Sequence, residues 1–175
     1  MISIRRILSF LLLSASLLFC TSSQAFEGDW EAGAAPGAIL MPSRDTYGGG
    51  AELFARYTVI HSLSVSFGAG FYGAQRTQLN HPLGLYTLRA GAVYALDVLE
   101  WVPGAGLHLS ALFSEDKKDI WHDKGKGIGL DFDLFVQDRG FRQLGISLFF
   151  TYHLVFTGPD YMTTGLSFSW HSDSF

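Results

Sequence analysis

A histidine and a serine two residues apart, in His108-Leu109-Ser110, are the residues of this sequence best suited to nucleophilic chemistry. On a β-strand, residues i and i+2 share a face, so the imidazole could activate the hydroxyl. The other acids and bases in similar segments form a larger set: Glu52, Arg56, Arg89, Asp131, Asp133 and His153. What all of these residues can do depends on the elements that hold them and on the face they occupy.

The segments that carry these residues alternate large apolar side chains with small or polar ones, which is the period of a half-buried strand. Gly, Pro and Asp-rich turn signals separate the segments. We predict eight strands, at 30–41, 51–60, 63–74, 85–96, 101–113, 127–137, 144–156 and 161–175. The predicted connections are 42–50, 75–84, 114–126 and 157–160 on one side, and 61–62, 97–100 and 138–143 on the other.

Composition decides which face of these strands meets water. Charged residues make up only 16% of the chain, and all four lysines fall in or beside one predicted loop, at positions 117, 118, 124 and 126. A soluble barrel, the alternative with the same strand period, would need Lys, Glu and Arg on most of its outer faces. We therefore expect lipid outside and polar residues inside, in an all-β, eight-stranded, antiparallel, up-and-down transmembrane barrel. Nothing in the sequence indicates nucleic-acid binding.

Residues 1–25 resemble a secretory signal peptide. Arg5 and Arg6 precede an apolar run, and the small residues around Ala25 suit cleavage. The barrel domain would then be 26–175, without cysteine. Two alternatives are an uncleaved membrane anchor, for which the apolar run is short, and lipidation at Cys20, which bulky Phe19 disfavours.

The last strand identifies a family resemblance. Met162, Thr164, Leu166, Phe168 and Trp170 share one parity, small residues share the other, and the chain ends in Phe175. This resembles the closing strand of the small eight-stranded outer-membrane barrels of the OmpX, OmpW and OmpA-barrel type. The resemblance implies a monomer exported to the bacterial outer membrane, with Phe168, Trp170 and Phe175 read by the barrel-insertion machinery. It also implies contact with outer-membrane lipid and lipopolysaccharide.

The strand parity places Glu52, Arg56, Arg89, His108, Asp131, Asp133 and His153 inside the barrel. The interior of so narrow a barrel is filled by side chains, so we expect these groups to pair, each acid near an arginine. They form either a structural polar core or a narrow ion path. Some barrels of this kind that deacylate lipid A carry a His-x-Ser pair, which makes His108 and Ser110 candidate hydrolase residues. Inward parity disfavours that hypothesis, because the substrate is a lipid.

Two further expectations concern the rims of the barrel. Aromatic residues form one girdle at Trp30, Tyr57, Tyr94, Trp101 and Trp170, and another at Phe71, Tyr86, Phe113, Phe156 and Tyr161. The loop 114–126 mixes charges with Trp121, and either is solvated or binds lipopolysaccharide phosphates or a host or phage partner. His122 has no partner at metal-ligand spacing, and we expect neither a metal nor a cofactor. Taken together, the sequence predicts a structural or surface-interaction protein, with a lipid A hydrolase or a narrow pore as alternatives.

Overall fold

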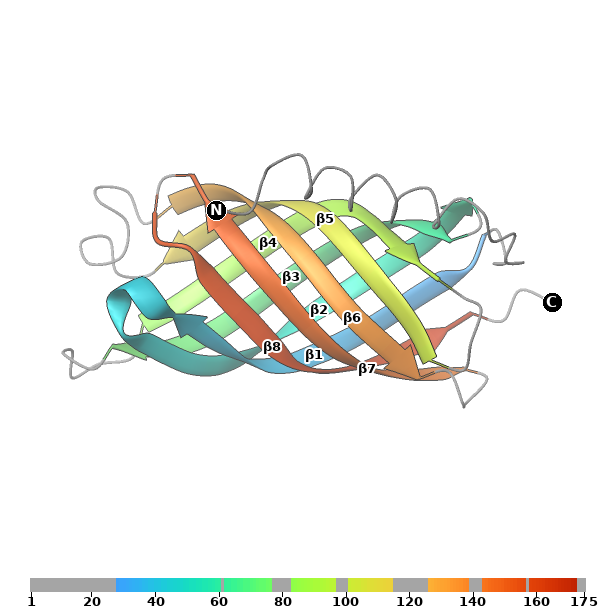
Figure 1. Ribbon diagram of the computed structural model, residues 1–175, viewed down its shortest axis with the longest axis horizontal. Helices are drawn as coiled ribbons and strands as arrows, with labels where there is room; N and C mark the ends of the chain where they lie inside the picture. The colour runs from blue at the N-terminus through green and yellow to red at the C-terminus, as the bar shows by residue number, and fades with distance from the viewer. Residues whose placement is uncertain are drawn as a thin grey trace, which may run out of the picture.

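The computed structural model is a single closed antiparallel barrel in which eight strands follow each other in chain order (Figure 1). It describes residues 28–60, 62–76, 83–96, 101–114, 126–138, 143–156 and 158–172. The strands are β1 (Trp30–Met41), β2 (Thr46–Ile60), β3 (Leu63–Arg76), β4 (Leu83–Ala95), β5 (Trp101–Ser114), β6 (Lys126–Asp138), β7 (Leu144–Val155) and β8 (Tyr161–His171). The predicted fold class is therefore confirmed. The proposed signal peptide 1–25, Cys20 and Phe175 lie outside the described residues.

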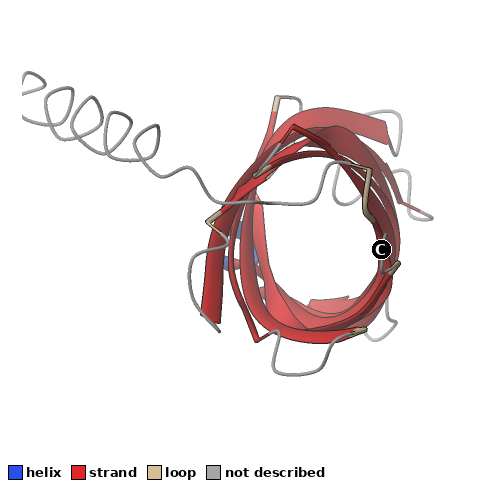
Figure 2. Ribbon diagram, turned by 90° about the vertical axis from the view of Figure 1, so that its right-hand side faces the viewer, coloured by secondary structure: helices blue, strands red, loops and turns tan. Residues whose placement is uncertain are grey.

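The ring is closed by pairing of β1 with β8, and Figure 2 shows the closed circle of strands along the axis. A path that starts at Trp30 of β1 and steps to the paired residue on each following strand, beginning with Tyr57, goes once around the barrel. It returns to β1 at Leu40. The stagger is thus ten residues, and such a stagger requires strands tilted by about 35–45°. We call the end where β1 begins and β8 ends the terminal end. The opposite end, which carries the short helix η1 (Pro42–Arg44), is the η1 end.

The two faces of the sheet match the predicted alternation. Large apolar side chains such as Leu53, Leu109 and Phe168 point out and are at least half exposed. Residues of the other parity, such as Glu52, Ser110 and Ser169, are buried in the interior. No helix long and apolar enough to cross a bilayer occurs in the part of the chain that the structure describes.

The strands extend further toward the η1 end than the sequence predicted. The expected loop 42–50 shrinks to η1 and Asp45, whose φ of 46° lies in a left-handed region that Asp tolerates. Gly48, Gly49 and Gly50 all belong to β2. A Cβ at Gly48 or Gly50 would meet the backbone of β3, and one at Gly50 would also meet the Tyr72 ring, so glycine permits the close pairing at these two positions. Likewise, Arg76 was expected in the loop 75–84, but it ends β3, opposite Thr46.

Pro36 leaves a defect in the seam between β1 and β8. The pairing runs from Glu31↔His171 to Ala34↔Phe168 and resumes at Gly37↔Gly165, so the pairs at 35 and 36 are missing. On its other side, Pro36 still pairs with Ala51 of β2. The defect therefore faces β8, as expected for a residue without a backbone N–H.

Candidate functional site

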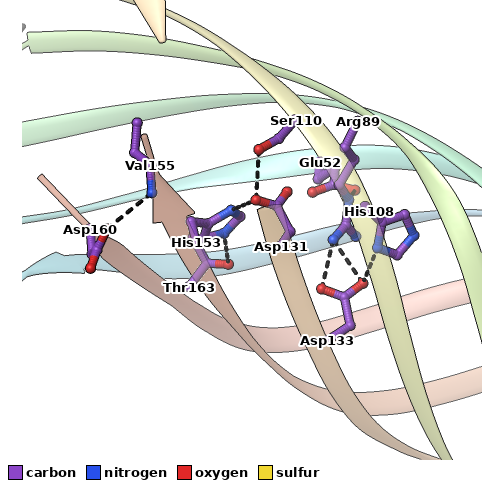
Figure 3. Close-up of polar contacts among 10 residues, drawn as sticks. All are labelled: Glu52, Arg89, His108, Ser110, Asp131, Asp133, His153, Val155, Asp160 and Thr163. Carbon is purple, nitrogen blue, oxygen red and sulfur yellow. Dashed lines mark hydrogen bonds and ion pairs between the residues drawn. The ribbon is translucent and has the colours of Figure 1, made fainter. Parts of the chain in front are cut away.

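Arg89 of β4 joins two carboxylates across the interior (Figure 3). Its Nε donates to Oε1 of Glu52 on β2, and its Nη1 donates to both oxygens of Asp133 on β6, at 2.9 and 2.8 Å. His108 Nδ1 lies 3.3 Å from Oδ2 of Asp133. We call these four residues the central charge cluster. All are nearly inaccessible, so each charge depends on its partners rather than on water.

A second group, the Asp131 cluster, lies on β5 to β8 next to the first (Figure 3). Ser110 Oγ donates to Asp131 Oδ1 at 2.7 Å, and His153 Nδ1 lies 2.9 Å from the same oxygen. The other ring nitrogen of His153 is 3.1 Å from Thr163 Oγ1. The sequence led us to expect each acid near at least one arginine. The direct contacts of Asp131 are with a serine and a histidine instead.

A third group fills the interior near the terminal end. Glu31 of β1 accepts hydrogen bonds from Arg56 Nη1 at 3.2 Å and from Gln137 Nε2 at 3.0 Å. The guanidinium of Arg56 also lies between the rings of Phe54 and Phe135, 4.8 and 4.7 Å from their centroids. Such stacking adds a cation–π attraction to the ion pair.

Gln137 extends this group to β8, where its Nε2 lies 3.1 Å from both Ser169 Oγ and His171 Nε2. Glu31, Arg56, Gln137, Ser169 and His171 together form the terminal-end cluster. Sequence reasoning missed Glu31 and Gln137, although both have the inward parity of their strands. The alternation of inward and outward residues, applied to every polar residue and not only to those in the middle of a strand, would have predicted Glu31 and Gln137.

The η1 end of the interior is apolar instead. The buried side chains there, which we call the apolar plug, are Ile39, Met41, Tyr72, Ala74, Leu85, Leu112, Val155 and Tyr161. Tyr161 was predicted to belong to an exposed aromatic girdle, but it is fully buried, and its ring stacks on His153 at 3.9 Å. The reason is its place as the first residue of β8, where its parity directs it inward. The interior thus passes from polar clusters to the apolar plug.

The arrangement of His108 and Ser110 does not suit acyl transfer. Ser110 donates to Asp131, and neither ring nitrogen of His108 makes a hydrogen bond within the described residues. A nucleophilic serine needs its base within hydrogen-bond reach and that base oriented by an acid. Here the acid, rather than the imidazole, contacts the hydroxyl, and both side chains face inward with exposures of 1% and 3%.

Other predicted sites fall on the exterior or outside the described residues. Phe168 and Trp170 of the proposed insertion signal are exposed outward, at 50% and 49%. The loop residues 115–125, including His122 and most of the lysines, lie outside the described residues. Within those residues, no group of three or more His, Cys, Asp and Glu side chains could hold a metal ion.

Comparison with models of known protein families gives no match, and neither does comparison with well-characterised protein sequences. Solved structures do resemble this barrel. Neisserial surface protein A matches over 85% of this chain and 98% of its own, with a TM-score of 0.57 and 20% identity. The outer membrane protein OprG of Pseudomonas aeruginosa gives the same coverage and TM-score at 9% identity. The attachment invasion locus protein Ail of Yersinia pestis matches over 84% and 100% of the two chains, with a TM-score of 0.50 and 16% identity.

These similarities define the class of fold. The chain has the fold of the small eight-stranded outer-membrane β-barrels, as its sequence predicted. The identities of 20%, 9% and 16% are low, so the likeness concerns the backbone and carries no ligand or activity from one protein to another.

Proposed function

We propose that this protein is a non-enzymatic barrel of the bacterial outer membrane with a structural or surface-interaction role. It reaches the membrane through the periplasm after removal of residues 1–25, and it stays a monomer. The observation that carries the proposal is the filled interior: three clusters of polar side chains that pair within each cluster, followed toward the η1 end by the apolar plug. Side chains that form hydrogen bonds and ion pairs with each other stabilise the barrel and are not free to act on a substrate.

The exterior supports a membrane location. Leucine, isoleucine, phenylalanine and tryptophan side chains are exposed on every strand, including Leu88, Leu134 and Leu148 at 54%, 60% and 62%. A soluble protein with so much contiguous apolar surface would associate or precipitate. In a bilayer, the same surface contacts acyl chains, and the closed ring leaves no strand edge in the hydrocarbon.

The two alternative functions have less support. A lipid A hydrolase would need its nucleophile on the lipid side, whereas His108 and Ser110 face inward, with His108 beside Asp133 and Ser110 hydrogen-bonded to Asp131. A pore would need a continuous wet path, whereas buried apolar side chains such as Tyr72 and Leu112 cluster in the interior at the η1 end, which disfavours one. Hydrophobic constrictions of this kind stop ions by excluding water.

Three measurements on one preparation test the proposal. The mature chain, folded into lipid vesicles, should shift its gel mobility on heating, leave the mass spectrum of added lipid A unchanged, and show no steady conductance in planar bilayers. A double variant, Tyr72→Ala with Leu112→Ala, is the control for conductance, because it removes two large plug side chains. Released acyl chains would favour the hydrolase, and conductance of the unaltered protein would favour the pore.

A further inference from the structure

The outer surface from β3 to β6 contains an apolar groove of about 520 Å³. Along the paired rows, Ala90 lies between Phe67 and Leu109, and Ala111 lies between Leu88 and Ile128. The two alanines form the floor, and the four larger side chains form the walls. The walls are highly exposed, since each of these four side chains keeps more than half of its surface accessible.

The direction of this groove follows from the register. Two steps lead along the floor from Ala90 to Ala111. The first follows β4 for two residues to Leu88, and the second crosses to Ala111, the residue of β5 that pairs with Leu88. Both steps lead toward the η1 end. The first does so because β4 begins at that end. The second does so because a path across the strands in chain order starts at Trp30 and returns to β1 at Leu40, which is nearer the η1 end. With strands tilted by about 35–45°, the two steps add along the axis and nearly cancel around the circumference. The groove therefore runs within about 10° of the barrel axis.

The next step in the same direction reaches Lys126, the first residue of β6. Lys126 lies two residues from Ile128, which pairs with Ala111, and its side chain is exposed with outward parity. It shares a row with Phe71, Tyr86 and Phe113, the aromatic residues expected at the membrane interface. Each step climbs about 8 Å, so the path from Ala90 to Lys126 spans about 16 Å. That is roughly half of a bilayer's ~30 Å hydrocarbon core, or one leaflet.

We propose that this groove is a binding site for one anionic membrane lipid, with an acyl chain over Ala90 and Ala111 and the lipid phosphate at Lys126. The inference rests on the proposed membrane location. Three features select this occupant: the apolar walls, a direction parallel to lipid chains, and a cation about one leaflet's thickness from Ala90. Charge complementarity favours an anionic headgroup, because a lysine amine near the membrane surface attracts anionic lipids.

The test is lipid retention by the folded mature chain, measured by native mass spectrometry with dipalmitoyl phosphatidylglycerol and the zwitterionic phosphatidylcholine. The unaltered protein should retain one lipid and prefer phosphatidylglycerol. Ala90→Leu with Ala111→Leu fills the groove and should abolish retention of both lipids. Lys126→Gln should reduce the preference for phosphatidylglycerol about fivefold while leaving phosphatidylcholine binding unchanged. Ala38→Leu, at an exposed outward position on β1 away from the groove, is the matched control and should retain lipid normally.

Retention that survives the groove-filling pair, or that Ala38→Leu lowers equally, would overturn the site. A lipid preference unchanged in Lys126→Gln would overturn the placement of the phosphate and with it the proposed ligand class. Heat-modifiable gel mobility, measured on every variant, separates these outcomes from misfolding. Failure of the unaltered chain to fold in vesicles would contradict the proposed function as well, whereas a folded barrel that retains no lipid contradicts only the site.

Discussion

Arg89 on β4 holds both carboxylate oxygens of Asp133 on β6 through a single nitrogen, Nη1, at 2.9 and 2.8 Å. The intervening strand β5 takes no part in this bond, so the ion pair connects non-neighbouring strands across the interior. The same guanidinium also binds Glu52 of β2. One side chain therefore ties three strands together.

Arg89→Met should be strongly destabilising, because it leaves Glu52 and Asp133 buried without their cation. Losing one partner of a buried pair costs about 3–5 kcal/mol. Lys126→Met, at an exposed position, should change the free energy of unfolding by no more than about 0.5 kcal/mol. Urea unfolding from lipid vesicles measures both values. Equal stabilities of the two variants would contradict the structural importance of the central charge cluster.

The stability cost of an arginine on the lipid-facing surface should depend on its depth in the bilayer. Phe150→Arg, on the outward face of β7, should cost about 2–4 kcal/mol if the residue lies near the bilayer midplane. Leu144→Arg, at the first residue of the same strand and also exposed outward, should cost about 0–1 kcal/mol. The comparison uses unfolding from vesicles. A mature chain that folds as a monodisperse barrel in buffer without detergent would reverse the assignment of inside and outside.

Removing the hydroxyl of Tyr161 is predicted not to lower stability, in contrast to the substitutions above. Its buried hydroxyl makes no hydrogen bond to the described residues, and a buried unsatisfied polar group costs about 1–3 kcal/mol. Tyr161→Phe should therefore leave stability unchanged or raise it. Tyr152→Phe should lower stability, since the Tyr152 hydroxyl donates to Asp160 at 2.7 Å. A destabilised Tyr161→Phe variant would indicate that the hydroxyl has a partner.

Adjacent glycines on β2 should respond differently to a methyl group. A Cβ at Gly50 would lie 2.6 Å from Cα of Tyr72, whereas a Cβ at Gly49 would meet its nearest neighbour at 3.5 Å. Gly50→Ala should thus cost about 1–3 kcal/mol through overpacking, and Gly49→Ala should be tolerated. Thermal or urea unfolding of the two variants decides the matter. Equal effects would contradict the assigned register of β2 and β3.

The orientation of the barrel is a prediction that labelling can test. Ser43 lies at the η1 end, which has most of the longer predicted connections and which we therefore expect outside the cell. Asp138 ends β6 at the terminal end. An impermeant thiol reagent should modify Ser43→Cys on intact cells but Asp138→Cys only after the outer membrane is opened. The reverse pattern would place the η1 end in the periplasm.

Strand parity made most of the fold predictable from sequence. A period of two, read with the scarcity of charge, gave the eight strands and the face of each residue, because a one-residue error would have exposed His108 and buried Leu109. The alternation predicts which side chains face the interior, but it does not predict which of them contact each other. The bond from Arg89 to Asp133, and the pairing of Asp131 with Ser110 and His153, depend on the stagger between strands, which long-range closure sets. The strand extension through Gly48 was hidden because glycine also marks loops.

The pairing of β1 with β8 has a kinetic consequence. Glu31 is among the first strand residues to be synthesised, yet its partners include Gln137 of β6, and its neighbour across the seam is His171 of β8. The ion pair with Arg56 lies within the first hairpin, whereas the contacts of this carboxylate with Gln137 and His171 need β6 and β8. Closing the ring therefore depends on contacts between residues at opposite ends of the chain, and contacts of such large sequence separation slow folding.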